Sequence, residues 1–215
     1  MLVNERLIEY INTLDSENSE ILNTIEKEAL RDNVPIVRKD MQAFLKFVLA
    51  LKKPEKILEA GTAIGFSSIL MGENSKKDCH ITTIENYQKR INIAKENIKR
   101  AGMTEKITLL EGDALEVMEK LDDKYDMIFL DASKGQYINL LPQVMRLLKN
   151  DGIVISDNMF QDGDLIESRF AVRRRDRTIH KRIRDYIYEI THNESLKTVL
   201  LPVGDGVAFT TRVSN

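Results

Sequence analysis

The sequence predicts a doubly wound α/β fold, in which a mostly parallel sheet of about seven strands ends in an antiparallel hairpin. Three observations predict it. Apolar positions recur at helical spacing up to about residue 50, and from Lys56 onward short apolar runs alternate with amphipathic helical patterns. The last two apolar runs flank a short glycine-rich connection. Strands that alternate with helices imply right-handed crossovers, and therefore a parallel sheet with helices on both faces.

Residues 1–52 are predicted to form a helical extension at the N-terminus of a single domain that spans residues 1–215. No repeat or linker-like stretch divides the chain. The apolar positions at three-to-four spacing are Leu7, Ile8, Ile11 and Leu14, then Ile21, Leu22 and Ile25, then Phe44, Leu45, Val48 and Leu51.

The middle of the chain is expected to supply five buried strands with helices between them. The C-terminal part is expected to supply one basic helix over residues 172–192 and a hairpin of two strands. The predicted strands are 57–60, 80–84, 107–110, 127–130, 153–156, 198–201 and 207–211, and the predicted helices of the middle part are 66–72, 87–100, 113–120 and 136–149.

The composition, with 42% hydrophobic and 31% charged residues, is that of an ordinary globular protein. No apolar run approaches the roughly 20 residues that a membrane span needs, so no membrane partner is expected. Residues 1–6 lack the basic start and apolar stretch of an export signal, which makes the cytoplasm the expected compartment. Cys79 is the single cysteine, so neither an internal disulfide nor a thiolate metal site is expected.

The net charge of -2 conceals a strong asymmetry. Between Arg169 and Arg184 eight basic residues accompany one acid, Asp176, which gives this segment a charge of +7 and leaves -9 for the rest of the chain. Such a segment can bind a polyanion. The alternative interpretation is a solvated helix face.

Glycines follow the first predicted strand in the pattern Glu59-x-Gly61-x-x-x-Gly65. They allow a tight turn and a close backbone approach before a helix, although glycines at such a place can also be simple turn formers. A dinucleotide-binding fingerprint needs a further glycine at position 63, where this chain has Ala63. A nicotinamide-dependent oxidoreductase is therefore disfavoured.

Acidic side chains stand at the ends of the next two strands, where ligands bind in open α/β sheets. Glu85 lies about 20 residues beyond the glycines and can accept hydrogen bonds from both hydroxyls of a ribose. Asp113 can accept from the exocyclic amine of a base such as adenine. Either residue alone could be a solvated carboxylate or a helix cap, but together they indicate a nucleoside pocket.

Oxygen donors follow the fourth and fifth strands. Asp131, Asp157 and Asn158 are expected at the tips of neighbouring strands, and this donor set suits Mg²⁺ or Mn²⁺ better than zinc. Three protein ligands leave positions at which two adjacent oxygens of a substrate can bind. The alternative is that Asp157 and Asn158 only cap a turn.

These motifs together resemble those of the cation-dependent O-methyltransferases, the catechol and caffeoyl-coenzyme A group. The resemblance covers nearly the whole chain. It is carried by residues 59–68, Glu85, 112–114, Asp131 with Lys134, and 156–158. Within the group, residues 34–37, 131–137, 173–175 and 202–206 are most similar to the bacterial tRNA 5-hydroxyuridine methyltransferases.

The resemblance implies a Rossmann-like methyltransferase that transfers a methyl group from S-adenosylmethionine to 5-hydroxyuridine at the wobble position of tRNA, giving 5-methoxyuridine. It also implies a homodimer. Lys134 matches the family's proposed base, and Asp131 is the second implied catalytic residue. The implied cofactor-binding residues are Val37, Gly61, Ser67, Glu85, Asp113, Ala114 and Asp131, and the implied ligands of Mg²⁺ or Mn²⁺ are Asp131, Asp157 and Asn158.

The chain departs from the catechol methyltransferases at two positions. Ala63 and Ala132 stand where those enzymes carry larger side chains around the cofactor, and the carboxylate that grips their second catechol oxygen has no counterpart in the sequence. Both differences weaken a catechol substrate more than they weaken methyl transfer.

The basic segment favours RNA over a small molecule, since arginines and lysines can collect the phosphates of an anticodon loop. In 5-hydroxyuridine the ring hydroxyl lies beside the O4 carbonyl, so the base offers two neighbouring oxygens as a catechol does. Two alternatives remain open, a methyltransferase for small catechol-like molecules and a noncatalytic RNA-binding module. The residues expected to bind RNA are Arg173, Arg174, Arg175, Arg177, Lys181 and Arg182.

Overall fold

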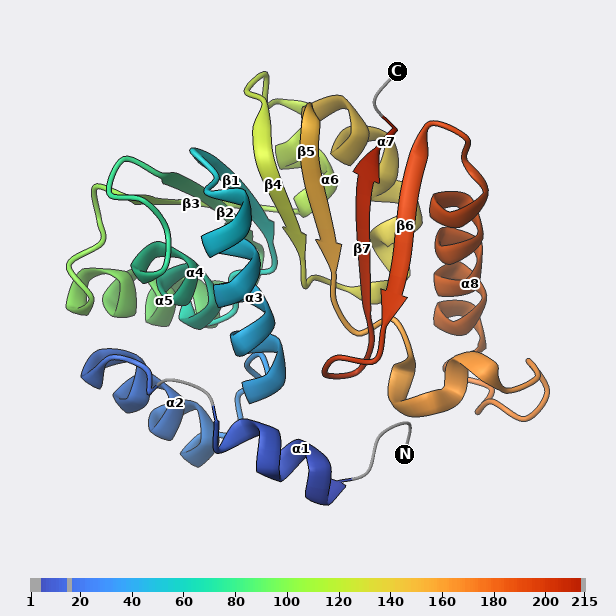
Figure 1. Cartoon of the computed structure of the whole chain (residues 1–215), viewed down its shortest axis with the longest axis horizontal. Coiled ribbons are helices and arrows are strands. Elements are labelled where there is room, and N and C mark those ends of the chain that lie inside the picture. The colour runs from blue at the N-terminus through green and yellow to red at the C-terminus, as the bar shows by residue number, and fades with distance from the viewer. Residues whose placement is uncertain (1–4, 15–16, 214–215) are drawn as a thin grey trace.

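The structure is a computed structural model that describes residues 5–14 and 17–213, and these residues form one seven-stranded sheet with helices around it (Figure 1). Residues 1–4, which carry most of the prediction of no export signal, lie outside the described residues. The strands are β1 (Lys56–Ala60), β2 (His80–Glu85), β3 (Ile107–Glu111), β4 (Tyr125–Leu130), β5 (Leu148–Ser156), β6 (Leu196–Leu201) and β7 (Val207–Arg212).

The strand order is β3-β2-β1-β4-β5-β7-β6, which confirms the predicted doubly wound sheet. β1 pairs in parallel with both β2 and β4, so the winding of the chain reverses between β1 and β4. β2 with β3 and β4 with β5 are also parallel pairs. Only β7 runs against its neighbours β5 and β6 among the described strands, and β6 with β7 forms the predicted antiparallel hairpin.

Helices cover both faces of this sheet, as Figure 1 shows. The α-helices are α1 (Glu5–Asn12), α2 (Glu20–Arg31), α3 (Lys39–Lys52), α4 (Phe66–Glu73), α5 (Gln88–Arg100), α6 (Ala114–Glu119), α7 (Tyr137–Leu147) and α8 (Arg177–His192), and the 3₁₀ helices are η1 (Lys134–Gln136) and η2 (Gln161–Ile166). α2, α3 and α4 contribute to one core cluster, and α6, α7 and α8 contribute to the other.

Strand β4 shows why the central strands are mostly apolar. Met127 and Phe129 belong to one core cluster, whereas Ile128 and Leu130 belong to the other. Successive side chains of a strand point to opposite faces, so a strand covered on both faces is apolar at most positions, with hydrogen-bonded exceptions such as Asp126. This is the continuous apolar pattern on which the sequence prediction depends.

The predicted N-terminal helices are present as α1, α2 and α3. Ser19 caps α2 by accepting a hydrogen bond from the Leu22 N–H at 3.3 Å. Leu22, Ile25 and Leu45 are fully buried in the core cluster that lies on this face of the sheet. α2 and α3 are thus packed on the sheet, and α3 leads into β1.

The prediction of a helix over residues 172–192 is wrong at its start, because α8 begins at Arg177. Residues 173–176 form a turn instead, in which the Asp176 N–H donates to the Arg173 carbonyl. The side chain of Arg177 donates to the carbonyls of Phe170 and Val172, so these carbonyls bond a guanidinium and not helical N–H groups. The helix predicted over 136–149 also ends earlier, at Leu147, where the chain enters β5.

None of the helices in the described part of the chain combines the length and apolar character that crossing a membrane requires.

Candidate active site

The glycine turn after β1 brings the ends of β1 and β4 into close contact. Gly61 has φ +108°, and a Cβ atom at this position would lie 2.2 Å from the carbonyl oxygen of Asp131. The N–H groups of Gly61 and Thr62 both donate to the carbonyl of Ile84, at 3.0 and 3.1 Å. Glycine is therefore required here for the backbone of one strand end to pass the other.

Glu59 supports this turn through hydrogen bonds and lines neither of the two cavities described below. It is fully buried, and its carboxylate accepts hydrogen bonds from Ser67 at 2.5 Å, from Ser68, and from Thr83 at 2.6 Å. Burial raises the pKa of Glu59, while the three hydroxyl donors oppose that rise. The hydroxyl of Ser67 thus fixes the turn, and its contact with a cofactor stays a prediction.

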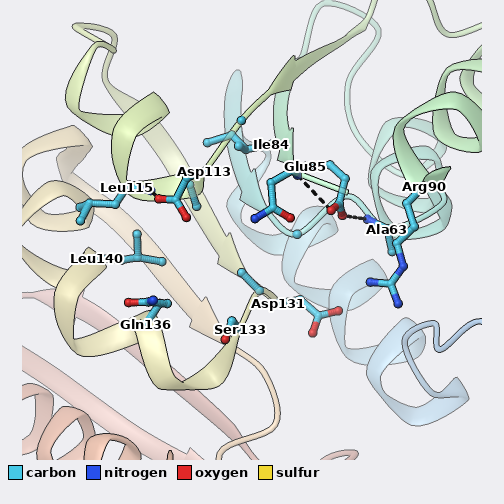
Figure 2. Close-up of a pocket in the computed structure, with 15 residues that line it drawn as sticks. Ala63, Ile84, Glu85, Arg90, Asp113, Leu115, Asp131, Ser133, Gln136 and Leu140 are labelled. Atoms are coloured by element: carbon cyan, nitrogen blue, oxygen red, sulfur yellow. Dashed lines mark hydrogen bonds between the residues drawn. The ribbon is translucent and has the colours of Figure 1, made fainter. Parts of the chain in front are cut away.

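A cavity of about 450 Å³ opens beside the turn, at the C-terminal ends of the strands (Figure 2). We call it the Glu85 cavity. Its volume lies in the range of small-molecule sites, and its place, next to the point where the winding reverses, is where open α/β sheets bind ligands. Five of the seven predicted cofactor-binding residues line it: Gly61, Glu85, Asp113, Ala114 and Asp131.

The carboxylate of Glu85 is held in a fixed position by backbone donors. It accepts hydrogen bonds from the N–H groups of Ala63 at 2.8 Å, Asn86 at 3.0 Å and Tyr87 at 2.9 Å. A carboxylate has about four acceptor sites, so it can still accept from a ligand hydroxyl. Across the cavity, Asp113 caps α6 by accepting from the Leu115 N–H at 2.9 Å. Both acids are preorganised acceptors.

A second cavity, of about 380 Å³, adjoins the first, and we call it the Asp157 cavity. Asp131, Ala63 and Arg90 line both cavities. The parallel pairing of β4 with β5 brings the residues that follow the two strands together, and all three predicted metal ligands line this cavity with Lys134. Val37, predicted to bind the cofactor, lies on this wall as well.

The two aspartates at these strand tips are costly to ionise. Burial raises the pKa of Asp131 well above its ordinary value, and the nearby charges of Asp157 and Glu59 raise it further. Burial also raises the pKa of Asp157 to about 6, against a hydrogen bond from the Asn158 N–H at 2.7 Å that lowers it. Two buried like charges that face one cavity are stabilised by a cation between them.

The donor set of the Asp157 cavity fits a hard divalent ion. Asp131 and Asp157 supply carboxylate oxygens, and Asn158 is held in the left-handed region at φ +58°. The described residues gather no group of three or more His, Cys, Asp or Glu side chains suited to a metal, and the predicted set differs from such a group in having the Asn158 amide as its third donor. Oxygen-only sets of this kind suit Mg²⁺ or Mn²⁺.

Lys134 stands at the edge of the same cavity, held by an acid that sequence reasoning did not assign. Its Nζ lies 3.4 Å from Oδ2 of Asp205, whose side chain is buried. Asp205 belongs to the connection between β6 and β7 and reaches the cavity because β7 pairs with β5. The sequence signal was present, since residues 202–206 carry part of the family resemblance.

Arg90 is the second residue that the sequence did not identify. Among the described residues that line the Glu85 cavity it is the only cation, and it also lines the Asp157 cavity. Its guanidinium carbon lies 5.8 Å from the ring centroid of Tyr87. Figure 2 shows the side chain extending from α5 past Ala63 toward Asp131. An arginine in the first turn of a helix carries no pattern by which it could have been singled out.

The six residues predicted to bind RNA do not form one helical face. Arg173, Arg174 and Arg175 are exposed in the turn before α8. Arg177 instead turns back and donates to backbone carbonyls of the preceding segment. Two predicted residues farther along α8 have partners in the chain: Lys181 pairs with Asp185 at 2.5 Å, and Arg182 donates to the Gly135 carbonyl at 3.2 Å.

Comparison with known proteins connects this arrangement with one family. The family model described as O-methyltransferase matches residues 12–213. The chain belongs to the O-methyltransferase family. The catechol O-methyltransferase of Niastella koreensis is 31% identical to this chain over 128 residues. The match spans 58% of this chain and 58% of that enzyme.

Solved structures of the family have the same fold. A Staphylococcus aureus protein provisionally assigned as a caffeoyl-CoA O-methyltransferase has a TM-score of 0.86 and 30% identity, with 97% of this chain and 98% of that chain covered. An O-methyltransferase from Bacillus cereus, solved in complex with SAH, has a TM-score of 0.84 at 21% identity, with 95% and 96% covered. Almost the whole chain therefore has the fold of these solved structures, which is the fold class that the sequence predicts.

Proposed function

We propose that this O-methyltransferase uses S-adenosylmethionine and a divalent metal ion to methylate the 5-hydroxyl of 5-hydroxyuridine at the wobble position of tRNA. One observation carries the proposal: Asp131 forms a wall shared by the Glu85 cavity and the Asp157 cavity. A methyl donor in the first cavity and a hydroxyl in the second would meet at this wall. Methyl transfer needs such alignment, because the two reacting atoms must approach in line.

The Glu85 cavity is the proposed site of the cofactor. Glu85 would accept hydrogen bonds from the ribose hydroxyls, and Asp113 would accept from the adenine amine. Arg90, the cation of this cavity, would hold the cofactor's carboxylate, for which the short side chain of Ala63 leaves room. The SAH found in the Bacillus cereus structure supports this class of ligand for the fold.

The Asp157 cavity is the proposed site of the metal and the substrate hydroxyl. Asp131, Asp157 and Asn158 would hold Mg²⁺ or Mn²⁺, which lowers the pKa of a hydroxyl that it binds. Lys134 would accept the hydroxyl proton at Nζ, and Asp205 would keep that Nζ turned toward the cavity. These residues prepare an oxyanion next to the methyl donor.

The choice of tRNA as substrate is supported by the basic segment at the same edge of the sheet. Arg182 contacts Gly135, the residue after Lys134, so the basic helix α8 adjoins the cavity wall. A loop base that reaches the cavity would leave its flanking phosphates near the arginines. Small catechol-like molecules are the second candidate substrates, and they are favoured by the activity for which the Niastella koreensis relative is named.

A methyl-transfer assay separates these substrates. Purified protein is given S-adenosylmethionine, Mg²⁺ and either a tRNA that carries 5-hydroxyuridine or a catechol, with and without a chelator. We expect 5-methoxyuridine in the tRNA only when metal is present. Methylation of the catechol alone would replace the tRNA proposal with the small-molecule one. Binding of tRNA without methyl transfer to either substrate would indicate a noncatalytic RNA-binding module.

We also propose that the protein forms a homodimer through its N-terminal helices. Large apolar side chains are exposed on α1 and α3, among them Tyr10 at 61%, Phe47 at 65% and Leu51 at 70% exposure. Burial of such side chains against a second copy would remove apolar surface from water. Light scattering of the wild type and of Phe47→Glu measures the mass in solution, and we expect a dimer for the first and a monomer for the second.

A further inference from the structure

The segment that runs from the last residue of η2 to the start of α8 exposes the two most solvent-accessible large apolar side chains of the described residues. Phe170 is 84% exposed and Ile166 is 76% exposed. We call residues 166–175 the basic turn, because Arg169, Arg173, Arg174 and Arg175 surround Phe170 in the sequence and are exposed too. Neither cavity includes any residue of this turn. An aromatic ring so fully in water, among arginines, points to a ligand that is both flat and anionic.

The backbone of the basic turn is held in place from several sides. Val172 is buried, at 4% exposure, and anchors the turn to the protein. Arg177 donates from Nη2 to the carbonyl of Phe170 and from Nε to the carbonyl of Val172, each at 3.2 Å. The Ala171 N–H donates to the Ser168 carbonyl at 2.9 Å. Phe170 is therefore exposed on a turn whose backbone is held by hydrogen bonds from Arg177 of α8.

A cation also lies against the Phe170 ring. The guanidinium carbon of Arg177 is 5.9 Å from the ring centroid, within the range of a cation–π contact. One guanidinium thus fixes the backbone of the turn and lies beside its aromatic side chain. Alternating aromatic and arginine side chains are the pattern by which proteins bind unpaired nucleotides, since bases stack on the rings and phosphates pair with the cations.

We propose that Phe170 stacks on an unpaired base of the bound RNA, outside the two cavities, while the arginines of the basic turn bind the adjoining phosphates. This rests on the proposed function and adds a second contact to it, because a substrate base enters the Asp157 cavity while another base lies on Phe170. β4 and β5 are parallel, so the basic turn and the cavities follow the same edge of the sheet, as Figure 1 shows for the segment after β5.

An RNA explains the turn better than a membrane surface does. Arginines with exposed apolar side chains also occur in segments that bind anionic bilayers, but such segments bury an extended apolar face. Here the apolar surface consists of Ile166 and Phe170, separated by three residues that include Glu167 and Arg169. Two separated apolar side chains do not make the extended apolar face that a bilayer needs, whereas a single ring is enough for one base.

The test uses the full-length protein and a hairpin RNA whose loop carries 5-hydroxyuridine, with 2-aminopurine as a fluorescent base at each other loop position in turn. We expect Phe170→Ala to weaken hairpin binding by about 5- to 100-fold, the effect of losing one base stack. Phe170→Trp should restore the affinity. At one loop position the quenching of 2-aminopurine seen with the wild type should disappear in Phe170→Ala.

The salt dependence distinguishes stacking from a general loss of charge. The slope of log Kd against log salt should be unchanged in Phe170→Ala. The slope should fall by about 0.7 for each phosphate that the protein no longer neutralises in the triple variant Arg173→Gln, Arg174→Gln, Arg175→Gln. Tyr188→Ala is the matched control, because Tyr188 is 63% exposed on α8 but stacks on His192. It should bind the hairpin as the wild type does, and all variants should bind duplex RNA equally apart from the arginine triple.

Equal hairpin affinity of Phe170→Ala and Tyr188→Ala would overturn the inference, as would a loss of binding to anionic phosphatidylserine vesicles without any loss of RNA binding. Methyl transfer by the wild type is measured on the same hairpin. If the wild type methylates it and Phe170→Ala binds normally, the stacking site is wrong and the proposed function stands. If the wild type binds in a Phe170-dependent manner but never methylates, the proposed function fails and the stacking site remains.

Discussion

The strand tips at Asp131 and Asp157 and the basic turn at residues 166–175 concentrate charge in opposite ways. The aspartates are drawn together by the pairing of β4 with β5, and burial raises the pKa of both. The arginines of the turn are exposed, where water and salt screen their mutual repulsion. Like charges on a surface cost the fold little, whereas like charges in a cavity cost folding free energy that a cation bound between them would offset.

The largest effect is expected when one of the acids of the Asp157 cavity is removed. We expect Asp157→Ala to lower metal-dependent methyl transfer by about a thousand-fold, because a ligand of the activating ion is lost. Initial rates at saturating Mg²⁺, together with calorimetric titration of Mn²⁺, measure this. Asp123→Ala is the matched control: Asp123 pairs with Lys56 on the surface and precedes β4, at the opposite edge of the sheet. Equal rates for the two variants would contradict the metal site.

The buried acids should also set how the metal-free protein responds to pH. The folded-state pKa of Asp157, about 6, lies above the ordinary value of 3.8, so the folded state binds more protons across this interval. The free energy of unfolding should therefore fall as pH rises from about 4 to 6 and stay lower above it. Asp157→Asn should reduce this slope, leaving the part due to Asp131, and raise the stability at pH 7 by about 1–3 kcal/mol.

Urea denaturation at a series of pH values measures the effect, with EDTA present throughout. In a separate series without EDTA, saturating Mg²⁺ should stabilise the wild type at pH 7 and leave Asp157→Asn nearly unchanged. A variant that is less stable than the wild type at pH 7 without metal would show that the carboxylate is not destabilised by its surroundings.

Arg90 differs from the arginines of the basic turn, because it is a cation on the wall of both cavities. Arg90→Gln should weaken binding of S-adenosylhomocysteine by about tenfold, since a charge-assisted hydrogen bond to the carboxylate is lost. Binding of 5′-methylthioadenosine, which lacks that carboxylate, should not change. Calorimetry gives both dissociation constants. An equal loss for the two ligands would place Arg90 against the nucleoside or show a structural role.

The smallest effect is expected at the surface. Replacing Arg173, Arg174 and Arg175 together with Gln should change the free energy of unfolding by less than about 0.5 kcal/mol, because exposed side chains without buried partners contribute little to folding. Thermal and urea denaturation measure this. A clear loss of stability would show that these arginines stabilise the fold of the turn, contrary to this prediction.

The fold was predictable because its signals are local. The apolar runs that became β1 to β5 are readable as short continuous stretches between helical patterns of period 3.6, the connection before β7 is readable from its glycines, and the structure confirms them. The start of α8 was not readable. Three arginines and Arg177 continue a helical pattern in the sequence, but the burial of Val172 and the bonds from Arg177 to backbone carbonyls favour a turn.

The candidate site was predictable in part for a related reason. Acids placed after strands must lie at one edge of a parallel sheet, so Glu85, Asp113 and Asp131 could be assigned to a common pocket. Asp205 and Arg90 could not. Asp205 comes from a hairpin and lies 71 positions from Lys134, and Arg90 comes from the side of a helix. Neither follows a parallel strand, so no rule about strand ends places it.

The amino-acid sequence by itself determined the order of strands and helices, the acids at the strand ends and the positive segment after β5, since each depends on residues close together in the chain. The tertiary structure decided which ends adjoin: the pairing of β4 with β5 gathers Asp131, Asp157 and Asn158, and the return of β7 brings Asp205 to Lys134. It also decided that Phe170 is presented to solvent. Pairing and burial result from packing between distant segments, and local periodicity carries no record of which segments will meet.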